Sequence, residues 1–131
     1  MTNINEIPFT YVVPSITLAA NAASQQNLVL MADSYFELMA IFATGGADAT
    51  TENTLVSPNN FSLLIRDNTS GCDLMSQRVP QRILCGNAFN GFLQRRPIVF
   101  EPQSNLLFDY LNLTAGNNTV TISLVGYKKK L

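Results

Sequence analysis

VTISLVGYK, residues 120–128, is the stretch that decides the class of fold. Val120, Ile122 and Leu124 alternate with small polar residues, and this two-residue period is typical of a strand with one face in a core and one in water. Two further strand-like stretches, residues 95–102 and 106–113, precede it and are separated by Pro, Gly and Asn signals. Together the three stretches predict a β-meander.

The stretch 106–113 is apolar on both of its faces. Leu106, Phe108 and Tyr110 share one face, and the other carries leucines on either side of Asp109. A strand that is apolar on both sides is usually covered on both sides. We therefore expect a second layer of this domain, or another subunit, to lie against each face.

Further strands are predicted upstream. Residues 28–31 form a short apolar run, and residues 61–67 alternate as a half-buried strand whose partner returns over 73–77 after a turn. Residues 35–43 are ambiguous, because Ser34 with Glu37 fits a helical capping box, but the strand-like flanks favour a strand. Several short strands with glycine, asparagine and proline punctuation predict an all-β fold, an antiparallel β-sandwich of jelly-roll type.

The N-terminal residues form the other distinct part of the sequence. In residues 7–14, IPFTYVVP, two prolines remove backbone donors, which favours an extended apolar arm over a central strand. We therefore expect an arm and connector over residues 1–24 and a sandwich domain over residues 25–131. The arm lies either on its own domain or on a neighbouring subunit, and both options stay open at this point. The loop between Gly45 and Asn60 is a candidate contact loop.

Composition limits the partners of the chain. Its 131 residues suit one domain, and 13% charged residues with a formal net charge of −1 provide no field that would attract nucleic acid. With 47% hydrophobic residues and so little charge, part of the surface is expected to be covered by partners. No apolar run is long enough to span a bilayer and the start lacks a basic signal region, so we expect no membrane contact and a protein made and used in the cytosol.

Little in the sequence points to chemistry. Histidine is absent and no phosphate-binding glycine motif occurs, so we expect no catalytic residue, no cofactor, no metal and no enzymatic activity. Cys72 and Cys85 are predicted to be buried free thiols, with a disulfide possible only outside a reducing compartment. The scattered carboxylates could still meet as a glycosidase pair, and the loop from Asp67 to Asp73 is a weak calcium candidate because it lacks the alternation of an EF-hand.

The C-terminal pattern resembles small virion structural proteins of tailed bacteriophages. The resemblance is carried by RPIVFEPQS over residues 96–104, Leu107-Phe108 and the closing residues 120–128. The nearest class is that of capsid auxiliary proteins, also called cement or decoration proteins. The resemblance implies a sandwich or jelly roll that forms homo-oligomers, either dimers or trimers, and binds major capsid protein on the capsid surface of the virion, often through an extended terminal arm.

Residue-level candidates for this interface come from physical arguments, because members of the class vary too much for direct transfer. Each candidate belongs either to the apolar arm or to one of the two basic clusters. They are Ile7, Phe9, Tyr11, Val12, Pro14, Arg95, Arg96 and Lys128. For the terminal lysines 128–130, the alternatives are a solvated terminus and a contact with an acidic partner.

A receptor- or carbohydrate-binding module of a phage tail or fibre is the alternative function. Jelly rolls host lectin sites, and Tyr11, Tyr35, Tyr110 or Tyr127 could stack on sugars. The absence of tryptophan argues against this alternative.

Overall fold

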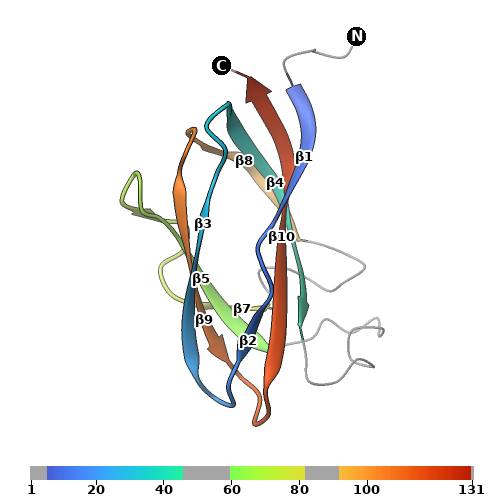
Figure 1. The fold of residues 1–131 in the computed structure, drawn as a ribbon, viewed down its shortest axis with the longest axis vertical. Helices are drawn as coiled ribbons and strands as arrows, with labels where there is room; N and C mark the ends of the chain where they lie inside the picture. Colours follow the sequence, from blue (N-terminus) through green and yellow to red (C-terminus); the bar gives the residue numbers. More distant parts are fainter. Residues whose placement is uncertain (1–5, 46–59, 82–91, 131) are drawn as a thin grey trace.

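The computed structural model describes residues 6–45, 60–81 and 92–130, with the side chains of all of these except 44, 45 and 92–97. Two antiparallel sheets pack face to face (Figure 1). Sheet A runs in the order β1 (Glu6–Val12), β10 (Asn118–Lys130), β4 (Ser34–Gly45) and β8 (Phe92–Phe100), with β2 (Ile16–Leu18) also paired to β10. Sheet B runs in the order β3 (Ala23–Val29), β9 (Asn105–Asn112), β5 (Phe61–Asp67) and β6 (Cys72–Asp73), with β7 (Val79–Pro80) also paired to β5. The predicted antiparallel β-sandwich is confirmed, and its finer assignment as a jelly roll stays a prediction.

The three C-terminal strands exist as predicted, but they do not form a meander. β8 and β10 lie in sheet A, whereas β9 lies between them in the chain and belongs to sheet B. The inward residues of β9 and β10 meet across the sandwich instead of lying side by side in one sheet. Figure 1 shows β9 and β10 in separate layers.

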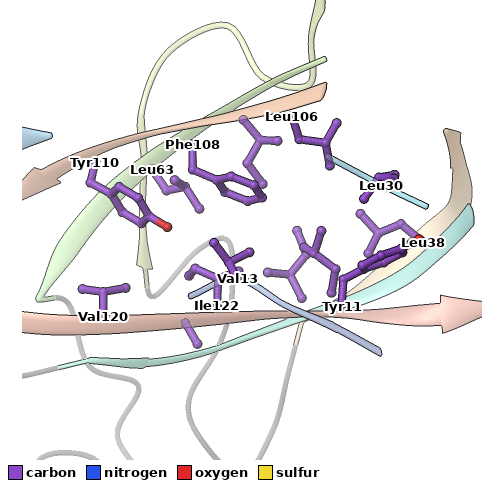
Figure 2. Close-up of a cluster of buried hydrophobic side chains, with 14 of the residues drawn as sticks. Tyr11, Val13, Leu30, Leu38, Leu63, Leu106, Phe108, Tyr110, Val120 and Ile122 are labelled. Atoms are coloured by element: carbon purple, nitrogen blue, oxygen red, sulfur yellow. The ribbon is translucent and has the colours of Figure 1, made fainter. Parts of the chain in front are cut away.

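The core fills the space between the two sheets. From sheet B, Leu63, Leu106 and Phe108 point toward sheet A, which contributes Val120 and Ile122 (Figure 2). All five side chains are fully buried. The alternation read in residues 120–128 therefore describes a real inward face.

The ambiguous residues 35–43 form part of β4, as favoured. β4 pairs with β10 from Ser34 to Gly45, and the register shifts between Val125 and Gly126. This bulge brings Gly126 so close to the backbone of Glu37 that a side chain there would overlap the Glu37 carbonyl oxygen. Position 126 consequently requires glycine because of close backbone approach.

The N-terminal segment is an edge strand of the sandwich, which corrects the prediction of a separate arm. β1 pairs with β10 along its full length, from Glu6 opposite Lys129 to Val12 opposite Ser123. In the same register the amide of Val13 donates to the carbonyl of Ile122 at 2.8 Å. Because bonded residues alternate along an antiparallel strand, Pro8 falls on the side that faces away from β10. Its missing N–H therefore costs the ladder nothing, as expected of proline on a sheet edge.

Burial also places this segment in the domain. Tyr11, Val13 and Leu18 are buried core residues. The amide of Met31 donates to the hydroxyl oxygen of Tyr11 at 3.1 Å, and burial raises the pKa of this hydroxyl. Of the two options left open, the segment lies on its own domain, so residues 6–18 are part of the sandwich although the sequence placed them in the segment 1–24.

The outer face of β9 is covered in part by the chain itself. Arg78, in the connection between β6 and β7, lies across this face and pairs with Asp109 at 3.0 Å. Leu107 and Leu111 are half-buried, while Leu113, just beyond β9, stays 42% exposed. The expected second covering layer thus exists over part of the strand.

One buried polar residue, Asn112, links two turns at one end of the sandwich. The side-chain amide of Asn112 donates to the carbonyls of Ala19 and Gly116, both at 2.9 Å, and its oxygen accepts from the amide and hydroxyl of Thr114. Asn112 is 2% exposed, so water cannot replace these bonds. The residue joins the turn before β3 to the turn before β10.

Replacement of Asn112 by alanine is expected to lower the free energy of unfolding by about 2 kcal/mol, because it removes the hydrogen bonds that this buried side chain makes to both turns. Urea denaturation followed by circular dichroism would measure the change. Asn117→Ala, an exposed residue of the same turn, is the control and should change stability by less than about 0.5 kcal/mol. Equal stability of the two variants would contradict the assigned role.

Candidate functional site

The outer face of sheet A is the main candidate for a binding surface. Across this face, Pro8 of β1 lies opposite Tyr127 of β10, which lies opposite Glu37 of β4, which in turn lies opposite Val99 of β8. Residues directly opposite one another in antiparallel strands share a face, so these four form one row across the sheet. Val99 is 57% exposed and Tyr127 is 40% exposed.

Neighbouring rows extend the apolar surface. On one side Tyr35, 39% exposed, lies opposite Lys129. On the other side Thr10 lies opposite Val125, and next to them Val12, 57% exposed, lies opposite Ser123. We call the exposed or half-exposed apolar residues of these rows the sheet A patch, which comprises Pro8, Val12, Tyr35, Val99, Val125 and Tyr127.

Three charged groups on this face are paired with one another. Lys129 Nζ lies 3.1 Å from Glu37 and 3.5 Å from Glu6. The hydrogen bond that Lys129 donates to Glu37, followed by the charge of that carboxylate, raises the pKa of Lys129. The two carboxylates and the ammonium therefore satisfy one another beside the apolar row.

The predicted interface residues of the N-terminal segment are divided between the two sides of β1. Val12 belongs to the sheet A patch, whereas Tyr11 is buried and Phe9 is half-buried against the core. Ile7 is 39% exposed on the inward side, and Pro14 is exposed with its carbonyl accepting a bond from Gln26 at 2.6 Å. The strand period thus separates residues that the sequence had grouped.

Lys128, expected at an interface, faces its own chain. Its ammonium lies 4.0 Å from the centre of the Phe9 ring, 2.7 Å from the sulfur of Met31 and 3.5 Å from Asp33. The residue is 8% exposed, so the view of residues 128–130 as a uniformly solvated terminus is wrong. A hydrogen bond from Ser34, supported by the charge of Lys128, lowers the pKa of Asp33.

Other predicted candidates lie partly or wholly outside the described residues. The backbone of Arg95 and Arg96 belongs to β8, but their side chains are not described. The candidate contact loop falls on residues 46–59, and Cys85 also lies outside the described part. Cys72 is a free thiol as predicted, but it is exposed at the start of β6, so the prediction of burial was wrong.

The calcium candidate has local partners. Asp67 Oδ1 accepts from the amide of Thr69 at 3.0 Å, which caps the turn, and Asp73 pairs with Arg66 at 3.0 Å. Within residues 6–45, 60–81 and 92–130, no group of three or more aspartate, glutamate or cysteine side chains could hold a metal ion. The same residues contain no helix long and apolar enough to cross a membrane.

A shallow pocket of about 440 Å³ opens on the outer face of sheet B. The residues that line it are Ser62, Gln77, Arg78, Pro80, Leu111 and Leu113. None of them is aromatic. Of the tyrosines proposed to stack on sugars, Tyr11 and Tyr110 are buried in the core, and Tyr35 and Tyr127 belong to the sheet A patch.

Sequence reasoning missed most of the sheet A patch. A signal was present in β10, where Val125 and Tyr127 occupy positions that the period assigns to water. The rows that join them to Pro8 and Val99 depend on strand order, which the sequence alone did not reveal.

Comparisons with known proteins leave the chain without a family. No protein-family model and no curated protein matches it. Among solved structures it is similar to the VP2 subviral particle of infectious bursal disease virus, with 98% of this chain and 38% of that chain covered, 10% identity and a TM-score of 0.37.

Two other solved structures are more distant. The structure of the Gt strain of infectious bursal disease virus has 10% identity and a TM-score of 0.30, with 95% of this chain and 38% of that chain covered. An antigen and type I fimbria protein of Burkholderia pseudomallei has 11% identity and a TM-score of 0.26, with 93% of this chain and 99% of that chain covered. The chain spans 38% of the length of the two viral chains, and at these TM-scores the likeness carries no argument about function.

Proposed function

We propose that this chain is a non-enzymatic virion structural protein, a capsid auxiliary protein of a bacteriophage. It binds the outside of the head and stabilises it by bridging subunits of the major capsid protein. The observation that carries the proposal is the sheet A patch, an apolar surface left exposed after the sandwich has completed its own core. The sequence resemblance to capsid auxiliary proteins supplies the identity of the partner.

Covering the sheet A patch favours attachment, because burial of apolar surface contributes roughly 25 cal/mol per Å² removed from water. Because Lys129 is already paired with Glu6 and Glu37, a partner covering the patch leaves no isolated charge among these three groups.

The protein would act by mass action, without turnover. A protein that binds the assembled shell and not its separated subunits shifts the equilibrium toward the shell. Several copies on one particle would add to the effect, since each copy ties neighbouring subunits together.

Binding to heads tests the proposal. Heads assembled without the protein would be mixed with the purified chain and pelleted, and the bound fraction measured against concentration. Val12→Glu and Val99→Glu place charges on the patch at positions that are each 57% exposed, so the fold should tolerate them. Each is expected to weaken binding at least about tenfold, equivalent to about 1.4 kcal/mol, and the double variant to weaken it further.

Leu113→Glu is the matched control for this experiment. Leu113 is an apolar residue with 42% exposure beside the other sheet, so the charge it introduces is similar and its location is different. This variant should bind heads as the unmodified chain does. Wild-type affinity of a folded Val12→Glu, Val99→Glu double variant would refute the assignment of the patch.

The receptor- or carbohydrate-binding alternative is favoured by one observation, the exposure of Tyr35 and Tyr127 in adjacent rows of the same face. Aromatic rings on a flat surface can stack on sugars. Glycan-array binding that disappears in Tyr127→Ala would support this function. Copurification with heads in a fixed ratio to major capsid protein would support the capsid function instead.

A further inference from the structure

One sheet edge lacks the protection found on the others. In the described part of the chain, β3 pairs with β9 on one side and with no strand on the other. The edge strands of sheet A contain Pro8 in β1 and Pro97 in β8, or are as short as the three residues of β2. The far side of sheet B ends in two strands of two residues each, β6 and β7. β3, with the sequence ASQQNLV, has no proline and no charged residue. Exposed edges without such features are available for pairing with another strand.

The hydrogen bonds that flank β3 show which of its backbone groups point outward. The amide of Asn112 donates to the carbonyl of Ala22 at 2.9 Å, and the amide of Leu30 donates to the carbonyl of Ser104 at 2.9 Å. Both pairs keep the register of β3 with β9, so the even-numbered residues bond to β9 and the odd-numbered ones direct N–H and C=O groups outward. The outward set is Ala23, Gln25, Asn27 and Val29.

The edge is also held in position. On the inward side, Gln26 accepts a hydrogen bond from the Tyr110 hydroxyl at 3.1 Å and donates to the carbonyl of Pro14 at 2.6 Å. These bonds fix the middle of β3 to both sheets, so binding another strand requires little additional ordering.

We propose that β3 pairs with β3 of a second copy of this chain. Sheet B then continues across a two-fold axis that lies midway between the two copies of Gln26. In this antiparallel register Gln25 lies opposite Asn27 of the second copy, and Ala23 lies opposite Val29. All four residues belong to the outward set, which gives on the order of eight backbone hydrogen bonds.

The sequence of β3 is complementary to itself in this register, which favours a second copy of the chain as the partner. Around Gln26 each amide side chain meets an amide, and the 61% exposed Val29 meets alanine, so no charge is opposed by a like charge. The pairing uses sheet B and leaves the sheet A patch uncovered. It depends only on the sheet edges, so it holds or fails independently of the capsid proposal.

Sedimentation equilibrium of the full chain tests the pairing. The unmodified chain is expected to have twice its monomer mass of 14.4 kDa. Asn27→Lys places a positive charge near the same charge of the second copy. Gln25→Pro removes an outward backbone donor without breaking a bond to β9. Both variants are expected to be monomers. Thr10→Lys is the matched control, since Thr10 has the corresponding outward position on the edge of β1, and it should remain dimeric.

Amide hydrogen exchange measured by NMR provides a second readout that does not depend on variants. In the dimer, the amides of Gln25, Asn27 and Val29 should exchange as slowly as those of Gln26 and Leu28, whereas in a monomer they should exchange rapidly. A monomeric wild-type chain would overturn the proposal. A dimer in which the odd-numbered amides exchange rapidly, or which both β3 variants leave intact, would overturn it as well.

Discussion

An alanine at position 126 is expected to lower the free energy of unfolding by about 3 kcal/mol, the upper part of the range for inserting atoms into a closely packed site. Its Cβ would overlap the carbonyl oxygen of Glu37 and lie 2.9 Å from the carbonyl carbon. Neither strand can easily move, because β10 is held by β1 on one side and by β4 on the other. The clash is with backbone, so a change of side-chain rotamer cannot relieve it.

Urea denaturation of Gly126→Ala against the unmodified chain measures this effect. Gly116→Ala is the matched control, since nothing lies within 4 Å of the position that its Cβ would occupy. The control should change stability by less than about 0.5 kcal/mol. If the two variants unfold at the same urea concentration, the close approach of β10 and β4 at the bulge is not present in the folded protein.

Deletion of residues 1–14 is expected to abolish cooperative folding. It removes β1, the core side chains of Tyr11 and Val13, and the ring contacts that join Phe9 to Tyr11 and Tyr11 to Phe36, each with 4.8 Å between ring centres. Loss of one large buried aromatic side chain alone costs about 3–5 kcal/mol. The whole domain is expected to have only about 5–15 kcal/mol of stability, so the combined loss would leave little or none.

This expectation replaces the one that follows from an arm outside the core, in which the shortened chain stays folded and only its attachment weakens. Thermal unfolding followed by circular dichroism separates the two. Deletion of residues 1–5 is the control, because it leaves β1 complete and should keep the unfolding transition. A chain lacking residues 1–14 with an unchanged transition would show that β1 is dispensable for the core.

The sequence predicted strands well because each strand carries its own alternation. Phe61, Leu63 and Ile65 in one strand and Val120, Ile122 and Leu124 in another point inward as the period required. β4 is a strand despite its capping-box residues. The same reasoning could not predict the strand order, because alternation specifies which face of a strand is apolar but not which sheet the strand joins. The predicted meander failed for this reason.

The candidate site was predicted only in part for a related reason. Val12 was identified because it is apolar in an apolar segment, but its neighbours on the patch come from β4, β8 and β10 and become neighbours only through pairing. The prolines of the N-terminal segment were correctly taken as incompatible with a central strand. These prolines are also compatible with an edge strand, because the backbone nitrogen of Pro8 faces away from β10. Lys128 and Lys129 are adjacent in sequence, yet one is buried over Phe9 and the other lies on the outer face.

We propose that the sheet A patch contacts major capsid protein, and a cryo-EM map of the particle that carries this chain would show the contact. We expect this domain on the outside of the head, with Val12, Val99 and Tyr127 buried against capsid subunits. A map in which the domain is attached through another surface, with these three side chains exposed to solvent, would contradict it.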